Sequence, residues 1–404
     1  MLSQVAKKHK SSDAQTEIIS QLPSYNEIRC QLSRHRNVRC TPIPDPLCIP
    51  DVLRTTLRGR FVGDDDSCKN ESFLLHEGQE GKLLVFCAQS ELRSIHQSQY
   101  LVCDGTFEMS PDTAYQLYTI HGFVKGEGMA LLWALLPNKT TSTYVEMLTA
   151  LKTALISAFG DSGVVDRTFL VDFEVGAINA IRQTFPEARL KGCSFHFRQA
   201  IMRRVQAEGL KSEYEAKEGD VSIRNWIRQI MAMTMLPTFA IPLAWTFLKD
   251  PPPTEHPTLN EKVRALSLYF ETTWIKGDFP VELWSHFDNF GPRTTNLAEG
   301  WHNGLNSRFG VPHPSLKTFL DWLQKCQHEV QCRGIQLSAG RPPKRRLQIY
   351  EKVDADITAA KIKYNLDFGE ASVNCYPASE IWVRFRNITV HFLNHMTYLV
   401  VGGH

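Results

Sequence analysis

The sequence lacks the features that mark several large protein classes. Its ten cysteines include no Cys-x-x-Cys pair, which excludes a zinc ribbon and argues against a disulfide framework. Its longest apolar run, Met129 to Leu136, is too short to cross a bilayer. The start of the chain has no apolar stretch of the kind found in signal peptides. We therefore expect an intracellular protein with reduced thiols and no membrane partner.

The chain also lacks a large net charge and any internal repeat. Its 45 Lys and Arg residues against 43 Asp and Glu residues leave a formal charge of +2, which is too small to attract a polyanion through the overall field. Any contact with DNA must then come from local basic patches. With 404 residues and 43% hydrophobic content, the chain can bury a large core and form more than one structural unit.

A regular pattern begins after an N-terminal region, residues 1–81, that includes a proline-rich linker at Thr41 to Asp51. The stretch Lys82 to Cys87 is apolar and typical of a strand, and residues 88–99 suit a short helix. From Gln99 to His196 three strand patterns follow one another, and then helix, strand, helix and strand patterns alternate. This order predicts an α/β fold of the ribonuclease-H-like type, with a mixed five-stranded sheet between helices.

The remaining sequence favours helices. We expect a compact domain over residues 82–310, with a helical insertion at about 205–290 before its last helix, which carries NLAEGWHNGLN and stops near Gly310. A further amphipathic helix is expected over Ser315 to Gln331. The whole segment 311–404 is interpreted as a helical and irregular C-terminal region.

Three acidic residues stand where a metal site could form. Asp104 and Asp172 each follow an apolar strand pattern, and the predicted strand order puts those two strands side by side in the middle of the sheet. Glu299 lies on the helix that follows the insertion. Carboxylate oxygens are the ligands preferred by hard divalent cations such as Mg²⁺, so these three acids are candidate metal ligands.

Such a site suits phosphodiester chemistry. Two divalent ions about 4 Å apart can activate the attacking oxygen and stabilise the leaving oxygen at a scissile phosphate. In this interpretation Asp104 bridges two Mg²⁺ or Mn²⁺ ions, and Asp172 and Glu299 each bind one of them. Each acid alone has a simpler explanation as a cap or a solvated charge.

Five motifs strengthen the interpretation when they are taken together. They are DGTFEMSP, YQLYTIHGFV, LVDFEVGAINAI, GCSFHFRQAI and NLAEGWHNGLN, and they occur in this order between Lys82 and Arg346. The sequence thereby resembles the transposase domain of Mutator-like elements (MULEs). The resemblance implies a DDE-type transposase whose catalytic, metal-binding triad is Asp104, Asp172 and Glu299, acting on double-stranded DNA at transposon ends and targets.

The resemblance also draws attention to a cysteine and two histidines. Cys193 and His196 match a Cys/His pair that follows the fifth strand in the family, and His302 lies three residues after Glu299 on the same helix face. A zinc site at the pair would need two further ligands, and no second pair of suitable spacing stands out. These residues are candidates for contacts to phosphate or to a triad carboxylate, and burial in the core is the alternative.

Two clusters of basic residues are candidate contacts to nucleic acid. Arg198, Arg203 and Arg204, with Lys211 after them, could neutralise DNA phosphates or form a solvated helix face. Arg341, Lys344, Arg345 and Arg346 lie among glycine and proline, as in a nuclear localisation signal or a minor-groove arm. The second cluster predicts a nuclear protein.

The sequence departs from the family in lacking the spacing of a zinc-finger domain before the core or of a SWIM-type finger after it. Two alternatives to an active transposase follow. One is a domesticated, non-catalytic DNA-binding or chromatin protein, and the other is a nuclease acting on RNA–DNA hybrids. A homo-oligomer is compatible with all three hypotheses, the active transposase included.

Overall fold

The computed structural model describes residues 49–57, 71–78, 82–309, 312–373 and 378–401. The chain divides into two compact units, each made of two segments. The sheet unit comprises Met1–Leu190 and Thr295–Lys344, and the helical unit comprises Lys191–Thr294 and Arg345–His404. Most of the predicted N-terminal region and linker lies outside the described residues, apart from a short helix, α4 (Asp51–Arg54), and its neighbours.

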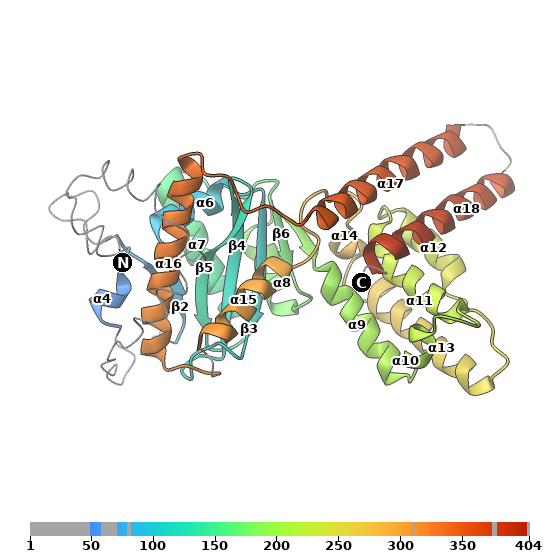
Figure 1. Ribbon diagram of the computed structural model, residues 1–404, viewed down its shortest axis with the longest axis horizontal. Helices are drawn as coiled ribbons and strands as arrows, with labels where there is room; N and C mark the ends of the chain where they lie inside the picture. The colour runs from blue at the N-terminus through green and yellow to red at the C-terminus, as the bar shows by residue number, and fades with distance from the viewer. Residues whose placement is uncertain (1–48, 58–70, 79–81, 310–311, 374–377, 402–404) are drawn as a thin grey trace. The chain divides into compact units, whose positions relative to one another are not determined.

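The sheet unit is built on a mixed sheet of seven strands in the order β1-β2-β5-β4-β3-β6-β7 (Figure 1). The strands are β1 (Leu74–Glu77), β2 (Leu84–Phe86), β3 (Tyr100–Thr106), β4 (Gln116–Val124), β5 (Glu127–Leu136), β6 (Thr168–Val171) and β7 (Arg189–Gly192). The α/β class is confirmed, but the predicted number of five strands is wrong. The apolar stretch at residues 82–87 forms β2, which pairs with β5 and extends the sheet, and β1 then pairs with β2.

The pairing in the middle of the sheet agrees with the prediction. β3, β4 and β5 form an antiparallel meander, and β3 also pairs with β6 in parallel. The boundary between the two units falls within β7, the last strand of the sheet. Asp104 lies within β3 and Asp172 directly follows β6, so the two aspartates belong to neighbouring strands of the sheet.

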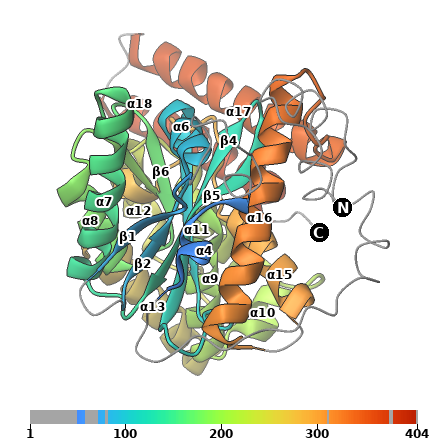
Figure 2. The same cartoon turned by 90° about the vertical axis from the view of Figure 1, so that its left-hand side faces the viewer.

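Helices cover both faces of the sheet (Figure 2). One face carries α6 (Gln89–Gln97), α7 (Thr141–Phe159) and α8 (Val175–Thr184), and the other carries α15 (Asn296–Phe309) and α16 (Leu316–Ser338). Thr140 caps the N-terminus of α7, because its side chain accepts a hydrogen bond from the Thr143 N–H. Gly160 caps the C-terminus, with φ at 86°. Local sequence signals thus define this helix at both ends.

The core under α15 and α16 is rich in aromatic side chains. Trp133 of β5 and Phe86 of β2 are paired residues of the sheet, both fully buried, and they pack with Phe319 of α16 in one hydrophobic cluster. Burying one such aromatic side chain contributes about 2–3 kcal/mol. Because the cluster joins α16 to the sheet, it fixes the helical layer that also includes α15.

The helical unit contains α9 (Ser194–Ala207) and a series of helices from both of its segments. They are α10 (Lys211–Glu215), α11 (Ser222–Ala232), η3 (Met233–Met235), α12 (Ala240–Leu248), α13 (Pro257–Phe270), η4 (Glu271–Ile275), α14 (Val281–Trp284), α17 (Gln348–Val373), α18 (Ala378–Met396) and η5 (Thr397–Val401). Helices occupy most of residues 205–290, where a helical insertion was predicted. The irregular pattern predicted for the end of the chain is wrong, because α17 and α18 are long helices that pack against each other.

Buried cations hold the loop that precedes α15. Lys191 Nζ donates to the carbonyls of Glu282 and Ser285 and to Asp288 Oδ1. Lys361 Nζ donates to the carbonyls of His286 (2.6 Å) and Asn289 (3.0 Å). Backbone carbonyls that face a core need donors, and lysine side chains supply them here.

Among the described helices, none is both long and apolar enough to span a membrane.

Candidate active site

Asp104 and Asp172 occupy neighbouring positions in the parallel pair β3 and β6. The register pairs Tyr100 with Thr168 and Val102 with Leu170, and the two aspartates come two residues later on each strand. Adjacent strands lie about 4.8 Å apart, and residues two apart on a strand share a face. Asp104 is 7% exposed, and Asp172 is half-buried just beyond the end of β6.

Helix α15 covers the face on which both aspartates lie. Its residue Ala298 packs in one buried cluster with Val102 of β3 and Leu170 of β6, the residues two positions before Asp104 and Asp172. Glu299 is the next residue along the helix, and its Oε1 accepts a hydrogen bond from Thr295 Oγ1 at 3.1 Å. The structure therefore brings the helix that carries Glu299 onto the same side of the sheet as the two aspartates.

His302 connects this helix directly to Asp104. Its Nδ1 lies 3.2 Å from Asp104 Oδ2, and because a carboxylate is an acceptor, the ring nitrogen donates. Its Nε2 lies 3.2 Å from Thr119 Oγ1. Since both ring nitrogens have partners and the side chain is buried, the orientation of the His302 ring relative to Asp104 is fixed.

The network extends one residue further, to His121 on β4. His121 Nε2 lies 3.0 Å from the hydroxyl of Thr119, and Thr119 is paired with Asp104 in the sheet. Burial lowers the pKa of His121 to about 3, and the neighbouring His302 contributes to the shift. His121 is therefore a neutral imidazole at physiological pH, held against the site by its hydrogen bond.

A second set of polar contacts surrounds Glu174, which immediately precedes α8. Tyr144 OH donates to Glu174 Oε1 at 2.8 Å and also lies 3.1 Å from Gln116 Oε1. Burial raises the pKa of Glu174; the hydrogen bond from Tyr144 opposes the rise, and the charge of Asp104 adds to it. Glu174 is thus a further carboxylate close enough to Asp104 for the two charges to interact.

Gly105, the residue after Asp104, leaves room for a neighbouring side chain. A Cβ at Gly105 would lie 1.7 Å from Gln116 Nε2, so the space above this residue is taken by the Gln116 side chain. The glycine allows Gln116 to reach Tyr144, and it thereby supports the contacts around Glu174.

The structure does not assemble a complete metal centre from the candidate ligands. Across the residues it describes, no three His, Cys, Asp or Glu side chains lie close enough together to hold a metal ion. The arrangement is two adjacent aspartates on the sheet, with Glu299 on the covering helix bonded to Thr295.

Two aromatic side chains follow Asp104 along the chain and are exposed. Phe107 is 43% and Tyr115 is 50% exposed, and their rings contact each other edge to face at 5.3 Å. Lys139 lies over the Phe107 ring at 5.7 Å. Exposed aromatic rings beside a lysine are the side chains that stack on bases and contact phosphates in single-stranded nucleic acid.

The other candidate residues belong to the helical unit. Cys193 is buried at the start of α9, and His196 lies in the first turn of that helix. Arg198 Nη1 donates to the carbonyl of Val400, and Arg204 pairs with Glu208. Arg203 is exposed, and it remains the most accessible of the three predicted phosphate contacts.

The basic segment after α16 is accessible. Lys344, Arg345 and Arg346 are all exposed. Arg346 pairs with Asp354 at 2.9 Å, and the Lys344 backbone N–H donates to Glu127 at 2.8 Å. The boundary between the two units falls between Lys344 and Arg345.

Several polar residues of the site were not predicted from the sequence. Thr119, His121 and Glu174 lie within motifs that the sequence analysis quoted, YQLYTIHGFV and LVDFEVGAINAI. A polar residue within an apolar strand is the signal that could have identified Thr119 and His121. Their contact with His302, 183 residues away from Thr119 in the chain, carries no local signal.

Comparison with known protein families gives a match. Residues 100–200 match the model of the MULE transposase domain, and this range contains Asp104, Asp172, Cys193 and His196. Searches of curated proteins and of solved structures found no match. The chain therefore carries a MULE transposase domain over residues 100–200.

Proposed function

We propose that the chain is a DDE-type transposase that cleaves DNA and joins strands through Asp104, Asp172 and Glu299. One observation carries the proposal: Asp104 and Asp172 each come two residues after the paired residues Val102 and Leu170 of adjacent parallel strands, and the helix of Glu299 packs on that pair through Ala298. The order β5-β4-β3-β6-β7 within the sheet supports a ribonuclease-H-like core extended by β1 and β2.

The donor set fits Mg²⁺ or Mn²⁺, because these ions prefer carboxylate oxygens. Asp104, Asp172 and Glu299 would hold the metal. Bound there, the metal would act as a Lewis acid for phosphoryl transfer.

The chain's own residues would position the reacting groups. His302 orients the Asp104 carboxylate, and Thr119 holds the other side of the His302 ring. Thr295 holds Glu299. The proposed reaction is hydrolysis of one DNA strand, followed by attack of the released 3′-hydroxyl on a second strand, without a covalent protein intermediate. Double-stranded DNA is the substrate, and a homo-oligomer would bring two transposon ends together.

A second candidate function is favoured by one observation. Because no three ligands converge among the described residues, the fold is also compatible with a domesticated transposase that binds DNA or chromatin without cleaving it. In that case the carboxylates would be relics, and divalent ions would have no specific effect on stability.

Asp172→Asn separates the two functions. Removing one of several neighbouring negative charges relieves repulsion, so the variant without metal should melt at the parent's temperature or higher. Mn²⁺ should stabilise the parent by mass action and the variant less, and cleavage of labelled duplex DNA should be lost. Asp250→Asn, which changes an exposed aspartate of the helical unit, is the matched control.

The opposite outcome would remove Asp172 from the proposed site. In that outcome, Asp172→Asn has a lower melting temperature than the parent in EDTA, but Mn²⁺ raises the melting temperature of both proteins by the same amount. An RNA–DNA hybrid should be included as a substrate, because preferential cleavage of the hybrid would identify a nuclease of another type.

We also propose nuclear localisation through the exposed segment of Lys344, Arg345 and Arg346. Replacing the three residues with Ala should leave a tagged protein in the cytoplasm. If the variant is as nuclear as the parent, another segment directs import.

A further inference from the structure

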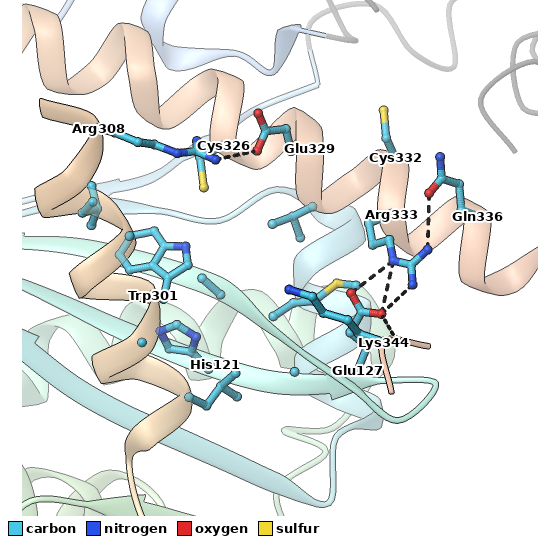
Figure 3. A pocket seen from close by; sticks show the side chains of 18 of the residues that line it. His121, Glu127, Trp301, Arg308, Cys326, Glu329, Cys332, Arg333, Gln336 and Lys344 are labelled. Carbon is cyan, nitrogen blue, oxygen red and sulfur yellow. Dashed lines mark hydrogen bonds and ion pairs between the residues drawn. The ribbon is translucent and has the colours of Figure 1, made fainter. Parts of the chain in front are cut away.

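The sheet unit contains a cavity of 540 Å³ between α15, α16 and the start of β5 (Figure 3). Cavities that bind small molecules usually measure about 300–1,000 Å³, so this one has the size of a ligand site. All its lining residues belong to the sheet unit. None of the three proposed catalytic acids lines it, and of the network around Asp104 described above it shares His121.

Aromatic rings form the middle of the cavity wall. Trp301 of α15 and Trp322 of α16 both line it, with their ring centroids 5.7 Å apart. The His121 ring stands edge to face with Trp301, also at 5.7 Å. Indole rings provide flat, polarisable surfaces on which another planar ring can stack. The wall therefore favours a planar heteroaromatic ligand.

The charged residues of the cavity leave an excess of positive charge. Four cationic side chains line it with only two carboxylates, and Figure 3 shows ion pairs at two places. Arg308 pairs with Glu329 at 3.6 Å, and Arg333 pairs with Glu127 at 2.6 Å. The further cations are Arg341 and Lys344. A wall in which cationic side chains outnumber carboxylates favours an anionic ligand such as a phosphate monoester.

Two glycines of α15 keep space open along the cavity. Gly300 and Gly304 are one helical turn apart and both line it. A Cβ at either position would meet no atom within 4 Å. Glycine within a helix costs about 1 kcal/mol relative to alanine, so the helix loses stability at the two positions where a larger side chain would narrow the cavity.

We propose that this cavity binds one nucleotide, with the base against Trp301 and Trp322 and the phosphate near Arg341 and Lys344. The bound nucleotide is either an unpaired residue of a DNA strand or a free nucleotide. The first source rests on the proposed function. It is supported by the position of His121, which lines the cavity and is linked through Thr119 and His302 to Asp104.

Calorimetric titration of the full chain in EDTA tests the cavity without any contribution from metal or cleavage. The probes are deoxyadenosine 5′-monophosphate, deoxyadenosine and inorganic phosphate. The nucleotide should bind at one site, and each fragment should bind at least tenfold more weakly, because each lacks half of the contacts. Inorganic phosphate that binds as tightly as the nucleotide would contradict a nucleotide site.

Gly304→Leu should fill the cavity and weaken nucleotide binding at least tenfold. The matched control is Gly334→Leu in α16, because Gly334 also has no atom near its Cβ position but does not line the cavity. Lys344→Ala should weaken binding, and Arg345→Ala should not, because Arg345 does not line the cavity. Equal nucleotide affinity in the parent and in Gly304→Leu would overturn the proposal.

Two further binding measurements identify the source of the nucleotide. If it is part of a strand, Gly304→Leu should weaken binding of a four-residue deoxyadenosine oligonucleotide at least fivefold and leave blunt duplex binding unchanged. If only the mononucleotide is affected, the source is a free nucleotide. Asp172→Asn should bind the mononucleotide as the parent does, so loss of cleavage with retained binding bears on the proposed function alone.

Discussion

The two units bury charges of opposite sign. In the sheet unit the buried charged residues include Glu91, which is 1% exposed, and Asp104, which is 7% exposed. In the helical unit they include Lys361, which is 2% exposed, and Lys191, which is 7% exposed. Burying an ion costs several kcal/mol unless hydrogen bonds or partners compensate. Each unit therefore has to compensate the free-energy cost of burial, for acidic side chains in the sheet unit and for lysine side chains in the helical unit.

The hydrogen-bond partners of these buried side chains differ between the two units. The lysines of the helical unit donate mainly to backbone carbonyls, which fixes a loop and leaves little capacity for other ligands. Asp104 is contacted by a histidine, and it lies next to Asp172 in the sheet. The buried lysines of the helical unit therefore hold backbone, whereas Asp104 of the sheet unit is contacted by a side chain, that of His302.

Removing a structural cation should have the largest effect on stability. Lys361→Met leaves the carbonyls of His286 and Asn289 without their donor, which should lower the unfolding free energy by about 3 kcal/mol. Lys363→Met, two residues away and exposed, is the control. Urea unfolding followed by circular dichroism measures both. Equal stability of the two variants would show that Lys361 does not have the proposed structural role.

The same lysine gives a dependence on pH. Burial lowers the pKa of Lys361 to about 7 from its usual 10.5. Between these values the unfolded chain binds more protons than the folded chain, so this contribution to stability grows as the pH rises from 7 to 10.5. The unfolding free energy of the parent relative to Lys361→Met should therefore increase over that range. A difference that stays constant would contradict the shift.

A buried acid should give the opposite slope. Burial raises the pKa of Glu91 from 4.5 to about 7, so the folded chain holds a proton that the unfolded chain has lost in this range. The contribution of Glu91 is complete below pH 4.5 and should fall by roughly 3 kcal/mol as the pH rises through 7. Glu91→Gln keeps an oxygen that can accept from the Ala88 N–H and should remove this slope.

Unfolding of the parent and of Glu91→Gln at pH 5 and pH 8 measures the effect. Glu146→Gln, at a carboxylate that is 45% exposed, serves as the control and should keep the parent's slope. If Glu91→Gln also keeps it, another group titrates in this window.

His302 should affect reaction rate more than stability if its main role is to position Asp104. Replacing a residue that orients a metal ligand typically costs 10–100-fold in activity or metal affinity. We expect His302→Ala to lose cleavage rate by about that factor and to need more Mn²⁺, with partial recovery in His302→Gln. His96→Ala, at a histidine that pairs with Asp161, is the control. Unchanged Mn²⁺ dependence in His302→Ala would argue against positioning.

The smallest expected effect concerns the exposed ring that follows Asp104. If Phe107 stacks on a base, Phe107→Ala should weaken binding of single-stranded DNA by about 1 kcal/mol, or roughly fivefold. The comparison is Phe239→Ala, which removes a 52% exposed ring from the helical unit. Fluorescence anisotropy with labelled DNA measures both. A larger loss for Phe239→Ala would place the DNA contact on the helical unit instead.

The sequence predicted those parts of the fold that depend on local patterns. Alternation and strand order were sufficient to place Asp104 and Asp172 at neighbouring strands, and the motif NLAEGWHNGLN was predicted on a helix, which is α15. Helices α17 and α18 were not predicted. In α17, exposed apolar residues such as Ile362 and Leu366 accompany the buried ones, so no single apolar stripe marks the helix.

The polar network of the site depended on details that no local pattern contains. The register of β4 and β5 shifts between Ile120 and His121, and this irregularity accompanies the contact between the side chains of Thr119 and His121. The approach of His302 to Asp104 further requires that α15 pack on β3 after the long helical insertion. Such contacts follow from the tertiary structure and cannot be read from spacing.

The division of the chain has a consequence for its synthesis. The segment with β3, β6 and the two aspartates is made first, whereas α15 follows about 125 residues after β6, behind the first segment of the helical unit. At ribosomal rates of about 5–20 residues per second, that interval lasts roughly 6–25 s. During this time the apolar face formed by Val102 and Leu170 lacks the helix that covers it. A nascent chain therefore exposes this surface to chaperones, and it cannot contain the complete acidic triad until α15 has left the ribosome.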